Sequence, residues 1–559
     1  MENPGLNPSP RTQNNFAAIF AGATVIAICL FSHLGALGLV GPDEPRYAWI
    51  ARAMAQTGDW VTPRLYGSPW FEKPVLYYWA AAIGFGLHLP AEWAARLPSA
   101  IAALATAFAI GWLGWKHYGT DCGSGLEKET GGLATNPVLL APVIFSTSVA
   151  AIGFARAATP DMLFSASIAL AMASAASCLR REGALRGQQN VSGSQENFPL
   201  GALVLFGAFL GLGVLAKGPA AVILAGGAIG IWALSTSRLR LALRLAHPIA
   251  IATFCIVALP WYVLCAHRNP DFLHVFIFQH NFERYLTSIF QHKQPFWFFG
   301  PIALLALLPW TPFLFAAAQQ GRRIARENSW RNSPGFFLAC WVLSPILFLS
   351  LSQSKLPSYI LPAIAPLAIL LAVSAKHVIG KSHGLSRLIY CSIAMIWLAL
   401  GAVGAEYFMA DPRSATASKL ILTVATVAAI LSVVFGSKRN LKALAFTSAF
   451  AAAISVEIAG VALLPNLDPV VTARERGTLI AESPQSNFYT YHLQRSWNYG
   501  LAFYAGREVA EWSPGNPGAA FLLTTPQGLT ELKKMGRFSG SVHPGERGIR
   551  YARIEAVSP

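Results

Sequence analysis

The sequence predicts a polytopic α-helical membrane protein with about 13 transmembrane helices and a C-terminal α/β domain. Of its 559 residues, 54% are hydrophobic and only 12% are charged, against roughly 25% charged in an average soluble protein. Long apolar runs follow one another along most of the chain, and most Lys and Arg fall in the short loops between them. Short basic loops of this kind are typical of the cytoplasmic face of a membrane protein.

Apolar runs of transmembrane length account for the predicted helices. A helix of about 17–25 apolar residues crosses the hydrocarbon core of a bilayer. Such runs lie at 16–38, 94–115, 136–155, 160–179, 199–216, 218–236, 246–266, 296–317, 335–351, 359–376, 387–408, 417–435 and 441–464. The first run is too long for the apolar part of a signal peptide and lacks a clear small-residue cleavage site, so we expect it to be retained.

A further run at residues 75–89 decides the orientation of every later helix. It is short for a span, and its aromatic residues Tyr77, Tyr78 and Trp79 suit a membrane surface. If it does not cross, the basic loops, including residues 238–244 and 322–331, all fall on the cytoplasmic side. We therefore predict a helix along the outer face here, a cytoplasmic N-terminus and a C-terminus on the outer face.

The chain changes character near residue 466. Three β-like runs, at 487–493, 519–525 and 551–557, alternate with helix-like stretches at 496–505 and 526–535 and with Gly/Pro turns. We predict a transmembrane domain at residues 1–465, with outer-face loops at 39–93 and 267–295, and a periplasmic α/β domain at 466–559.

Charge and cysteine content exclude two classes of function. The net charge is +16, but no basic stripe with interleaved aromatic residues is present, which argues against nucleic-acid binding. The seven cysteines lie mostly inside apolar runs without a CxxC spacing, so neither a disulfide framework nor a cysteine zinc site is indicated.

Residues 41–74 concentrate charge directly after the first apolar run. Asp43, Glu44 and Arg46 lie near its start, and Glu72 and Lys73 near its end. Charges beside hydrocarbon are costly unless they are paired or used, so they are candidates for function. Pro at residue 45 and Gly at residue 58 predict a short helix over 46–57, whose N-terminus favours ionised carboxylates. For Glu44 alone, an ordinary capping role is the favoured interpretation.

Other lone charges lie in the predicted outer-face turns. Asp161 begins a membrane helix, and the alternative to a functional role is a cap with Arg156 as its ion-pair partner. Lys217 lies between two apolar helices, which implies an anionic partner. For His280, the alternative to a functional role is an ordinary hydrogen-bonded surface residue. The cations and one tyrosine of these segments form a candidate phosphate-binding set: Lys73, Lys217, Arg284, Lys355 and Tyr359.

Six motifs carry a family resemblance. They are the D-E-x-R-Y-A segment, FEKP, the Thr-Pro-Asp turn, LxKGP, QHKQPFWFF and SKLPSYILP. Together they resemble the bacterial lipid A aminoarabinose transferases, glycosyltransferase family 83, which share the GT-C fold with protein O-mannosyltransferases. The resemblance covers residues 16–465. It implies an inner-membrane enzyme with a periplasmic active site that transfers a sugar, with inversion, from a polyprenyl phosphate.

The resemblance also implies substrates and roles. In the aminoarabinose branch, 4-amino-4-deoxy-L-arabinose passes from undecaprenyl phosphate to a lipid A phosphate. It implies catalytic roles for Asp43, Asp161 and Glu72. It implies substrate binding by Arg46, Tyr47, Lys73, Lys217, Arg284 and Tyr359. We add Lys293 and Lys355 to this set because of their positions in the predicted outer-face segments. The family allows a divalent metal such as zinc, for which Glu72 and His280 are candidate ligands, although two ligands fall short of a usual zinc site.

One departure from the family leaves the sugar open. Trp70 stands where the aminoarabinose transferases have Tyr, as WFEKP instead of YFEKP. The enzymatic alternative is transfer of another sugar to protein or to an envelope glycan. A lipid-linked-sugar flippase is the alternative from a different class, and the concentration of candidate residues on one face argues against it.

Overall fold

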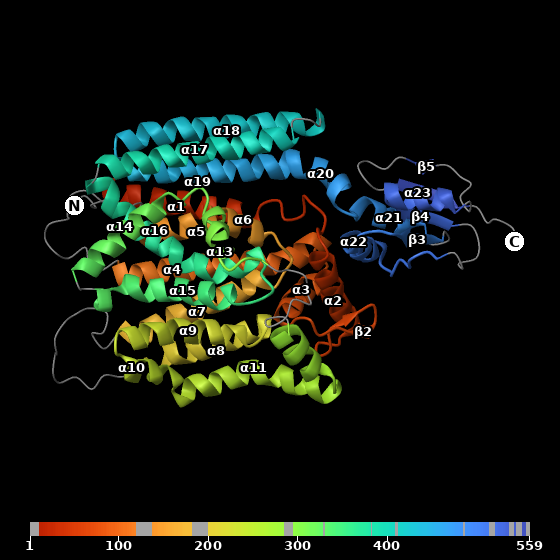
Figure 1. The fold of residues 1–559 in the computed structure, drawn as a ribbon, viewed down its shortest axis with the longest axis horizontal. Helices are drawn as coiled ribbons and strands as arrows, with labels where there is room; N and C mark the ends of the chain where they lie inside the picture. Colours follow the sequence, from red (N-terminus) through yellow and green to blue (C-terminus); the bar gives the residue numbers. More distant parts are fainter. Residues whose placement is uncertain are drawn as a thin grey trace, which may run out of the picture.

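The computed structural model describes residues 10–118, 137–180, 199–283, 294–327, 330–381, 383–408, 412–483, 487–513, 520–535, 542–543 and 550–554. Its long helices lie side by side in a bundle, and the C-terminal strands lie beyond one end of that bundle (Figure 1). The N-terminus is at the opposite end from the C-terminus. Helices α2 and α3 lie at the end of the bundle that faces the C-terminal part (Figure 1).

The bundle contains the helices that the hydropathy pattern predicts. They are α1 (Pro10–Phe31), α4 (Ala91–Tyr118), α7 (Asp161–Arg180), α8 (Leu200–Lys217), α9 (Ala220–Ser235), α11 (Pro248–Arg268), α15 (Pro334–Ser350), α16 (Leu361–Lys381), α17 (His383–Phe408), α18 (Pro412–Ser437) and α19 (Leu441–Ile458). Within the described residues, 8 helices are long and apolar enough to cross a membrane, and three shorter apolar helices accompany them. The chain is therefore a multi-span membrane protein, while the count of thirteen spans stays a prediction.

Two predicted spans are divided into two helices each. The 136–155 run forms α5 (Pro137–Ser146) and α6 (Val149–Ala155), because Ser148 adopts an extended backbone and its hydroxyl accepts a hydrogen bond from the Ala151 amide. The 296–317 run forms α13 (Phe299–Ala306) and α14 (Phe313–Arg326). Pro312 immediately precedes α14 and lacks the amide hydrogen that a continuous helix needs.

The predicted loop at 267–295 is partly helical. Helix α11 continues to Arg268, and residues His274–Glu283 form a short π-helix, η4. The 39–93 segment contains α2 (Asp43–Thr57), a small hairpin of β1 (Arg64–Leu65) and β2 (Ser68–Pro69), and α3 (Leu76–Gly86).

The positions of α2 and α3 in the chain agree with those of the two short helices that the sequence predicts, but Tyr77 and Tyr78 of α3 are buried in the protein and do not lie on its surface. Gly58 follows α2 with a φ of 70°, and its amide donates to the Met54 carbonyl, which ends the helix as predicted. Helix α3 has 11 residues and is therefore only about 16 Å long, too short for the roughly 30 Å hydrocarbon core. The prediction that residues 75–89 do not cross is consistent with this length.

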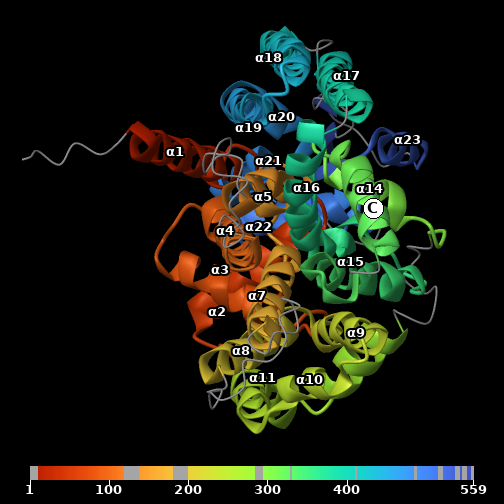
Figure 2. The ribbon, with the colours of Figure 1, turned by 90° about the vertical axis from the view of Figure 1, so that its left-hand side faces the viewer.

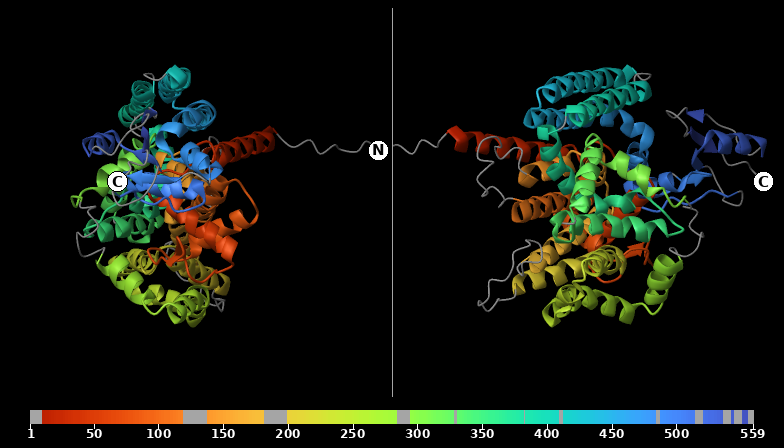
Figure 3. Two further views of the ribbon diagram at one scale, coloured as in Figure 1. Left: turned by 90° about the vertical axis from the view of Figure 1, so that its right-hand side faces the viewer. Right: turned by 60° about the vertical axis from the view of Figure 1, so that its left-hand side comes forward.

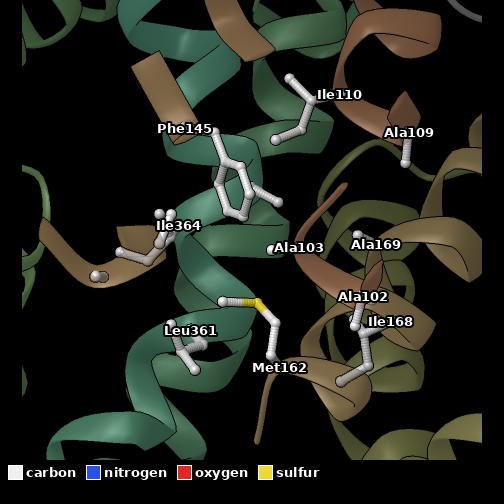
Figure 4. Close-up of a cluster of buried hydrophobic side chains, with 14 of the residues drawn as sticks. Ala102, Ala103, Ala109, Ile110, Phe145, Met162, Ile168, Ala169, Leu361 and Ile364 are labelled. Carbon is white, nitrogen blue, oxygen red and sulfur yellow. The ribbon is translucent and has the colours of Figure 1, made fainter. Parts of the chain in front are cut away.

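The centre of the bundle is an apolar core of small and branched side chains. Figure 4 shows Ala102 and Ala103 of α4, Phe145 of α5, Met162 of α7 and Ile364 of α16 meeting there. All five side chains are buried. The alanines allow α4 to lie close to its neighbours, and the larger residues of the other helices fill the remaining space. The end-on view in Figure 2 shows α4, α5, α7 and α16 in the middle, with α17 and α18 on one side and α8, α9 and α11 on the other.

A glycine sets the contact between α8 and α11. A Cβ atom at Gly207 would lie 2.2 Å from the carbonyl oxygen of Ala250, a backbone atom that cannot move without shifting α11. Small residues allow this kind of close helix approach in membranes. At Gly201 in the same helix, no atom of the described residues outside the adjoining turns of that helix lies within 4 Å of such a Cβ.

We expect Gly207→Ala to destabilise the protein by about 1–3 kcal/mol, the usual cost of overpacking. Gly201→Ala is the matched control and should be neutral or slightly stabilising, since Ala is the better helix former. Thermal unfolding of both variants in detergent measures the difference. Equal unfolding temperatures would show that the two helices separate without cost.

The C-terminal part contains a four-stranded sheet in the order β3-β4-β6-β5. Strands β3 (Phe488–Tyr491) and β4 (Ala520–Thr524) are parallel, while β6 (Arg550–Ile554) is antiparallel to β4 and to β5 (Val542–His543). Helices α21 (Arg474–Glu482), α22 (Arg495–Ala505) and α23 (Pro526–Lys534) accompany the sheet. Figure 3 shows these elements from two further sides. The predicted domain boundary at 465 falls inside α20 (Leu464–Val471), which continues from α19 through the π-helix η7 (Ala459–Leu463).

Candidate active site

A cluster of charged side chains lies at the N-terminal end of α2. The Arg46 guanidinium donates to the Asp43 carboxylate at 2.5 Å and lies 2.9 Å from the Glu72 carboxylate. The Lys73 ammonium is 3.7 Å from the other oxygen of Glu72. The Arg46 side chain is only 6% exposed and Glu72 13%, whereas Asp43 is 48% exposed. The cluster therefore presents one accessible carboxylate above a buried ion pair.

Aromatic rings surround Arg46. The guanidinium carbon lies 5.2 Å from the centre of the Tyr47 ring and 5.5 Å from each of the rings of Trp70 and Tyr499. Cation–π contacts of this kind hold a buried guanidinium in one orientation. Tyr47 itself is buried against Tyr77 and Tyr78, with ring centres 6.0 Å apart in both cases. Tyr47, which the resemblance implies as a substrate-binding residue, is thus a buried packing residue beneath Arg46.

A second cluster joins three segments that are far apart in the sequence. Lys217, the last residue of α8, forms an ion pair with Asp161, the first residue of α7. The Lys217 ammonium also lies 4.9 Å from the Tyr359 ring centre and 5.3 Å from that of Phe164. Tyr359 belongs to the turn η6 (Pro357–Ile360) that precedes α16. The anionic partner that the sequence implies for Lys217 is therefore Asp161.

The two charged clusters lie close to one another, because the carboxylate of Glu44, next to Asp43, accepts a hydrogen bond from the amide of Ala158, three residues before Asp161. Partial burial raises the pKa of the Asp43 carboxyl above its usual value, Arg46 and Lys73 oppose this rise, and the charges of Glu72 and Asp161 add to it. Asp161 is thus near enough to Asp43 for their charges to repel. Carboxylates and cations from α2, the FEKP turn, α7 and α8 consequently form one site at the end of the bundle.

Glu44 has a different role from the capping role that the sequence favoured. It does not cap α2, and its carboxylate accepts hydrogen bonds from the amides of Val40 at 2.8 Å and Ala158 at 2.7 Å. It also pairs with Arg96 at 2.7 Å, and both side chains are 5% exposed. Glu44 therefore ties the start of α2 to the turn before α7.

Arg96 was missed by the sequence reasoning. Besides Glu44, it donates to the carbonyls of Leu34, Leu37 and Gly38 at 2.5–2.8 Å. A signal was present, since a lone arginine inside the predicted span 94–115 marks a functional or structural site.

Arg156 does not pair with Asp161, contrary to the capping alternative. Its guanidinium donates to the carbonyls of Cys29, Ile28 and Ser32 at the end of α1. Cationic side chains are common partners for the last carbonyls of a helix. Lys217 is therefore the cationic partner of Asp161 among the described residues.

Among the described residues, the Lys355 ammonium contacts neither of the two charged clusters. The buried ammonium donates to the carbonyls of Ser352 at 2.5 Å and Gln294 at 3.0 Å. These bonds close the turn before η6 and join it to the chain at residue 294. Arg284 and Lys293 lie outside the described residues.

The candidate metal ligands do not form a zinc site in the part of the chain that the structure describes. Those residues contain no group of three or more His, Cys, Asp or Glu side chains that could hold an ion. The Glu72 carboxylate contacts Arg46 and Lys73, and His280 lies on η4. Together they would supply two of the three or four protein ligands that zinc needs. A divalent metal stays a prediction, and no step of the reaction proposed below depends on it.

The chain is similar to several known glycosyltransferases. A family model for dolichyl-phosphate-mannose-protein mannosyltransferase matches residues 17–276. The undecaprenyl phosphate-alpha-4-amino-4-deoxy-L-arabinose arabinosyl transferases of Yersinia enterocolitica and Erwinia tasmaniensis are 32% and 33% identical to this chain over 379 and 364 residues. Each alignment covers 65% of this chain, and the chain spans 62% and 60% of the length of these two relatives.

Solved structures show the same architecture. ArnT from Cupriavidus metallidurans bound to undecaprenyl phosphate matches with a TM-score of 0.73 at 20% sequence identity, over 97% of this chain and 98% of that one. The apo state of the same protein matches with a TM-score of 0.70 over 98% of both chains.

The bundle and its charged end therefore define a membrane protein with the GT-C fold, as the resemblance implied. More particularly, the chain is similar to the undecaprenyl phosphate aminoarabinose transferases over 65% of its length, in agreement with the resemblance carried by its six motifs.

Proposed function

We propose that this protein is an inverting glycosyltransferase that moves 4-amino-4-deoxy-L-arabinose from undecaprenyl phosphate to a lipid A phosphate. The observation that carries the proposal is the joining of Asp43, Arg46, Glu72 and Lys73 with Asp161 and Lys217 at one end of the bundle. The curated relatives bear the name of this activity, and a solved relative of the same fold binds undecaprenyl phosphate.

Cations at this site would stabilise the leaving phosphate. Lys73 and Lys217, with the Tyr359 hydroxyl, are the groups that we assign to the donor phosphate, where charge accumulates as the glycosidic bond breaks. Arg284, Lys293 and Lys355 remain candidates for the same phosphate or for the acceptor. A positioned cation is worth most where water is excluded, and the Lys73 and Lys217 side chains are 18% and 14% exposed.

Carboxylates would orient the sugar. A lipid A phosphate is already anionic, so its oxygen can attack the anomeric carbon without a general base. Asp43 and Asp161 are then free to bind the ammonium and hydroxyl groups of aminoarabinose by charge-assisted hydrogen bonds.

Buried donors beside Arg46 support a ligand rich in oxygen. The Arg46 Nε, the Trp70 Nε1 and the Tyr78 hydroxyl are buried without a hydrogen-bond partner among the described residues. An unsatisfied buried donor costs about 1–3 kcal/mol, so a substrate that supplies acceptors is favoured. Trp70 is also the residue that departs from the family motif, so a difference in sugar specificity would arise at this position.

The orientation in the membrane is part of the proposal. We infer a bacterial inner-membrane location, a cytoplasmic N-terminus, and a periplasmic active site and C-terminal part. The support is the distribution of basic loops and the position of α2, α3 and the C-terminal elements at one end of the bundle (Figure 1).

As the pH is lowered, we expect the activity of the enzyme to be lost at a pH above the usual pKa of an aspartate side chain. The carboxyl of Asp43 has a raised pKa in the folded protein, so it takes up a proton at a higher pH than the roughly 3.9 of a free side chain. The ionised form is present above that pKa and is lost as the pH falls through it. A profile of kcat against pH in detergent measures the acid limb. A limb below pH 4 (~3.9 being the usual value) would contradict the assigned requirement for ionised Asp43.

The direct test uses purified protein with undecaprenyl phosphate-linked aminoarabinose and lipid A, with the products identified by mass spectrometry. We expect lipid A to gain one aminoarabinose. A parallel test compares lipid A from a deletion strain with that from its parent, where we expect loss of the sugar and increased polymyxin sensitivity. Unchanged lipid A in both experiments would reject the acceptor, and altered glycoproteins would instead support transfer to protein.

A further inference from the structure

The backbone from Leu34 to Val40, here called the entry loop, leads directly into Asp43. Its polar groups are bound from two sides. Arg96 of α4 accounts for three of its carbonyls, and Glu44 accepts from the amide of Val40. Further contacts come from the C-terminal helices.

Three side chains from helices α20, α21 and α22 bind the entry loop. Arg474 donates to the carbonyls of Gly35 at 3.0 Å and Ala36 at 3.3 Å. The Asp468 carboxylate accepts from the amide of Gly38 at 2.6 Å. The Tyr504 hydroxyl accepts from the amide of Leu39 at 2.8 Å.

These three side chains are held by one another and by α4. Arg474 pairs with Asp468 at 2.6 Å and with Glu92 at 3.2 Å. The Tyr504 hydroxyl donates to Glu92 at 2.8 Å. Tyr504 therefore uses its hydroxyl twice, as acceptor from the loop and as donor to α4, so its position is defined from both sides.

Glycine at residue 38 makes this close approach feasible. A Cβ atom there would lie 2.6 Å from the Thr472 hydroxyl and 3.0 Å from both Asp468 and Tyr504. Any larger residue would push the C-terminal helices away from the loop.

Helix α22 also contacts α2 itself. Tyr499 stacks on Arg46, whose guanidinium holds Asp43. One to two turns further along both helices, Arg52 donates to the Phe503 carbonyl at 2.9 Å and lies 4.2 Å from the Phe503 ring centre. The C-terminal helices thus contact the segment that carries Asp43 both before and after this residue.

We propose that the C-terminal helices are a structural part of the catalytic site, with Arg474 and Tyr504 as positioning residues that hold the entry loop and thereby Asp43. The proposal rests on the proposed function for the assigned role of Asp43. These residues do not touch the reacting groups. A misplacement of about 1 Å at a catalytic group can cost up to about 100-fold in rate, so loss of the contacts should reduce kcat.

The test compares Tyr504→Phe with Tyr491→Phe in the full-length protein in lipid nanodiscs. Tyr491 lies in β3, and its hydroxyl contacts Glu531 at 3.5 Å instead of the entry loop. Hydrogen–deuterium exchange reports on the Leu39 amide, and steady-state kinetics with undecaprenyl phosphate-linked aminoarabinose gives kcat and KM. Thermal unfolding checks that each variant is folded.

For Tyr504→Phe we expect about fivefold faster exchange at Leu39, matching the loss of one hydrogen bond of about 1 kcal/mol. We also expect kcat to be about tenfold lower with the donor KM unchanged. Tyr491→Phe should change neither. Gly38→Ala, which acts from the opposite side of the contact, should reproduce the effects of Tyr504→Phe.

Two results would overturn the proposal: unchanged exchange at Leu39, or faster exchange with a normal kcat, which would make the contact purely structural. If the wild-type protein transfers no aminoarabinose, the proposed function fails separately. Exchange in the Tyr504→Phe variant then decides alone whether the C-terminal helices hold the entry loop.

Discussion

Replacing Asp43 by Asn is expected to lower kcat by roughly 100-fold or more, the usual effect of removing a positioned charge from an active site. Asn has nearly the same shape and can still accept a hydrogen bond from Arg46, which donates to Asp43 at 2.5 Å. The substitution therefore removes the charge of the one accessible carboxylate while leaving the ion pair of Arg46 and Glu72 in place.

The same substitution should not destabilise the protein at neutral pH. Partial burial raises the pKa of Asp43, with Glu72 and Asp161 adding to the rise, so ionised Asp43 is disfavoured in the folded state relative to the unfolded state. Stability linked to this group is greater below its folded pKa than above it. We expect the Asn variant to unfold at a temperature no lower than that of the wild type, with its activity lost.

Asp59→Asn is the matched control for the Asp43 variant. Asp59 lies in the same segment, but its carboxylate contacts Arg64 and Arg268 and no residue of the two charged clusters in the described part of the chain. We expect it to leave kcat within about twofold, as for a surface ion pair. Full activity of Asp43→Asn at a normal protein level would reject the role of Asp43.

Arg96→Ala should be strongly destabilising. Breaking a buried ion pair by removing one partner costs about 3–5 kcal/mol, because the other charge remains buried and unpaired. Arg96 and Glu44 are each 5% exposed. The substitution also leaves the carbonyls of Leu34, Leu37 and Gly38 without their donor.

Arg323→Ala provides the control, because Arg323 pairs with Glu327 at the same 2.7 Å but the two side chains are 63% and 51% exposed. An exposed pair is worth about 0–1 kcal/mol. Thermal unfolding in detergent compares the two variants. We also expect Arg96→Met combined with Glu44→Gln to recover part of the loss, since no buried charge is then left unpaired. Equal unfolding temperatures for the two alanine variants would contradict the stabilising role of the buried ion pair between Arg96 and Glu44.

Local features of the chain were predictable from the sequence because they depend on neighbours in the chain. The runs of apolar residues placed the bundle helices to within a few residues, and Gly58 placed the end of α2. The divisions at Ser148 and Pro312 were missed, since an apolar run with a capping serine or a proline has the same hydropathy as an unbroken one.

Residue types also narrowed the site before any geometry was known. An ammonium between two apolar helices required an anion, and Lys217 indeed pairs with Asp161. The identity of that anion was open, because Arg156, much nearer to Asp161 in the sequence than Lys217 is, was the alternative ion-pair partner of Asp161. Arg156 instead binds carbonyls at the end of α1.

Hydropathy, loop charge and six short motifs thus determined the class of membrane protein, the group of transferases that the chain resembles and most of the charged residues at the site. Folding determined which of these residues meet. Tyr499 reaches Arg46, and Tyr504 reaches Leu39, across more than 450 positions of the chain. Such contacts depend on how helices pack in three dimensions, and no periodicity or local preference along the chain encodes them. For the same reason, Glu44 looked like a helix cap in the sequence and proved to be the partner of Arg96 in the fold.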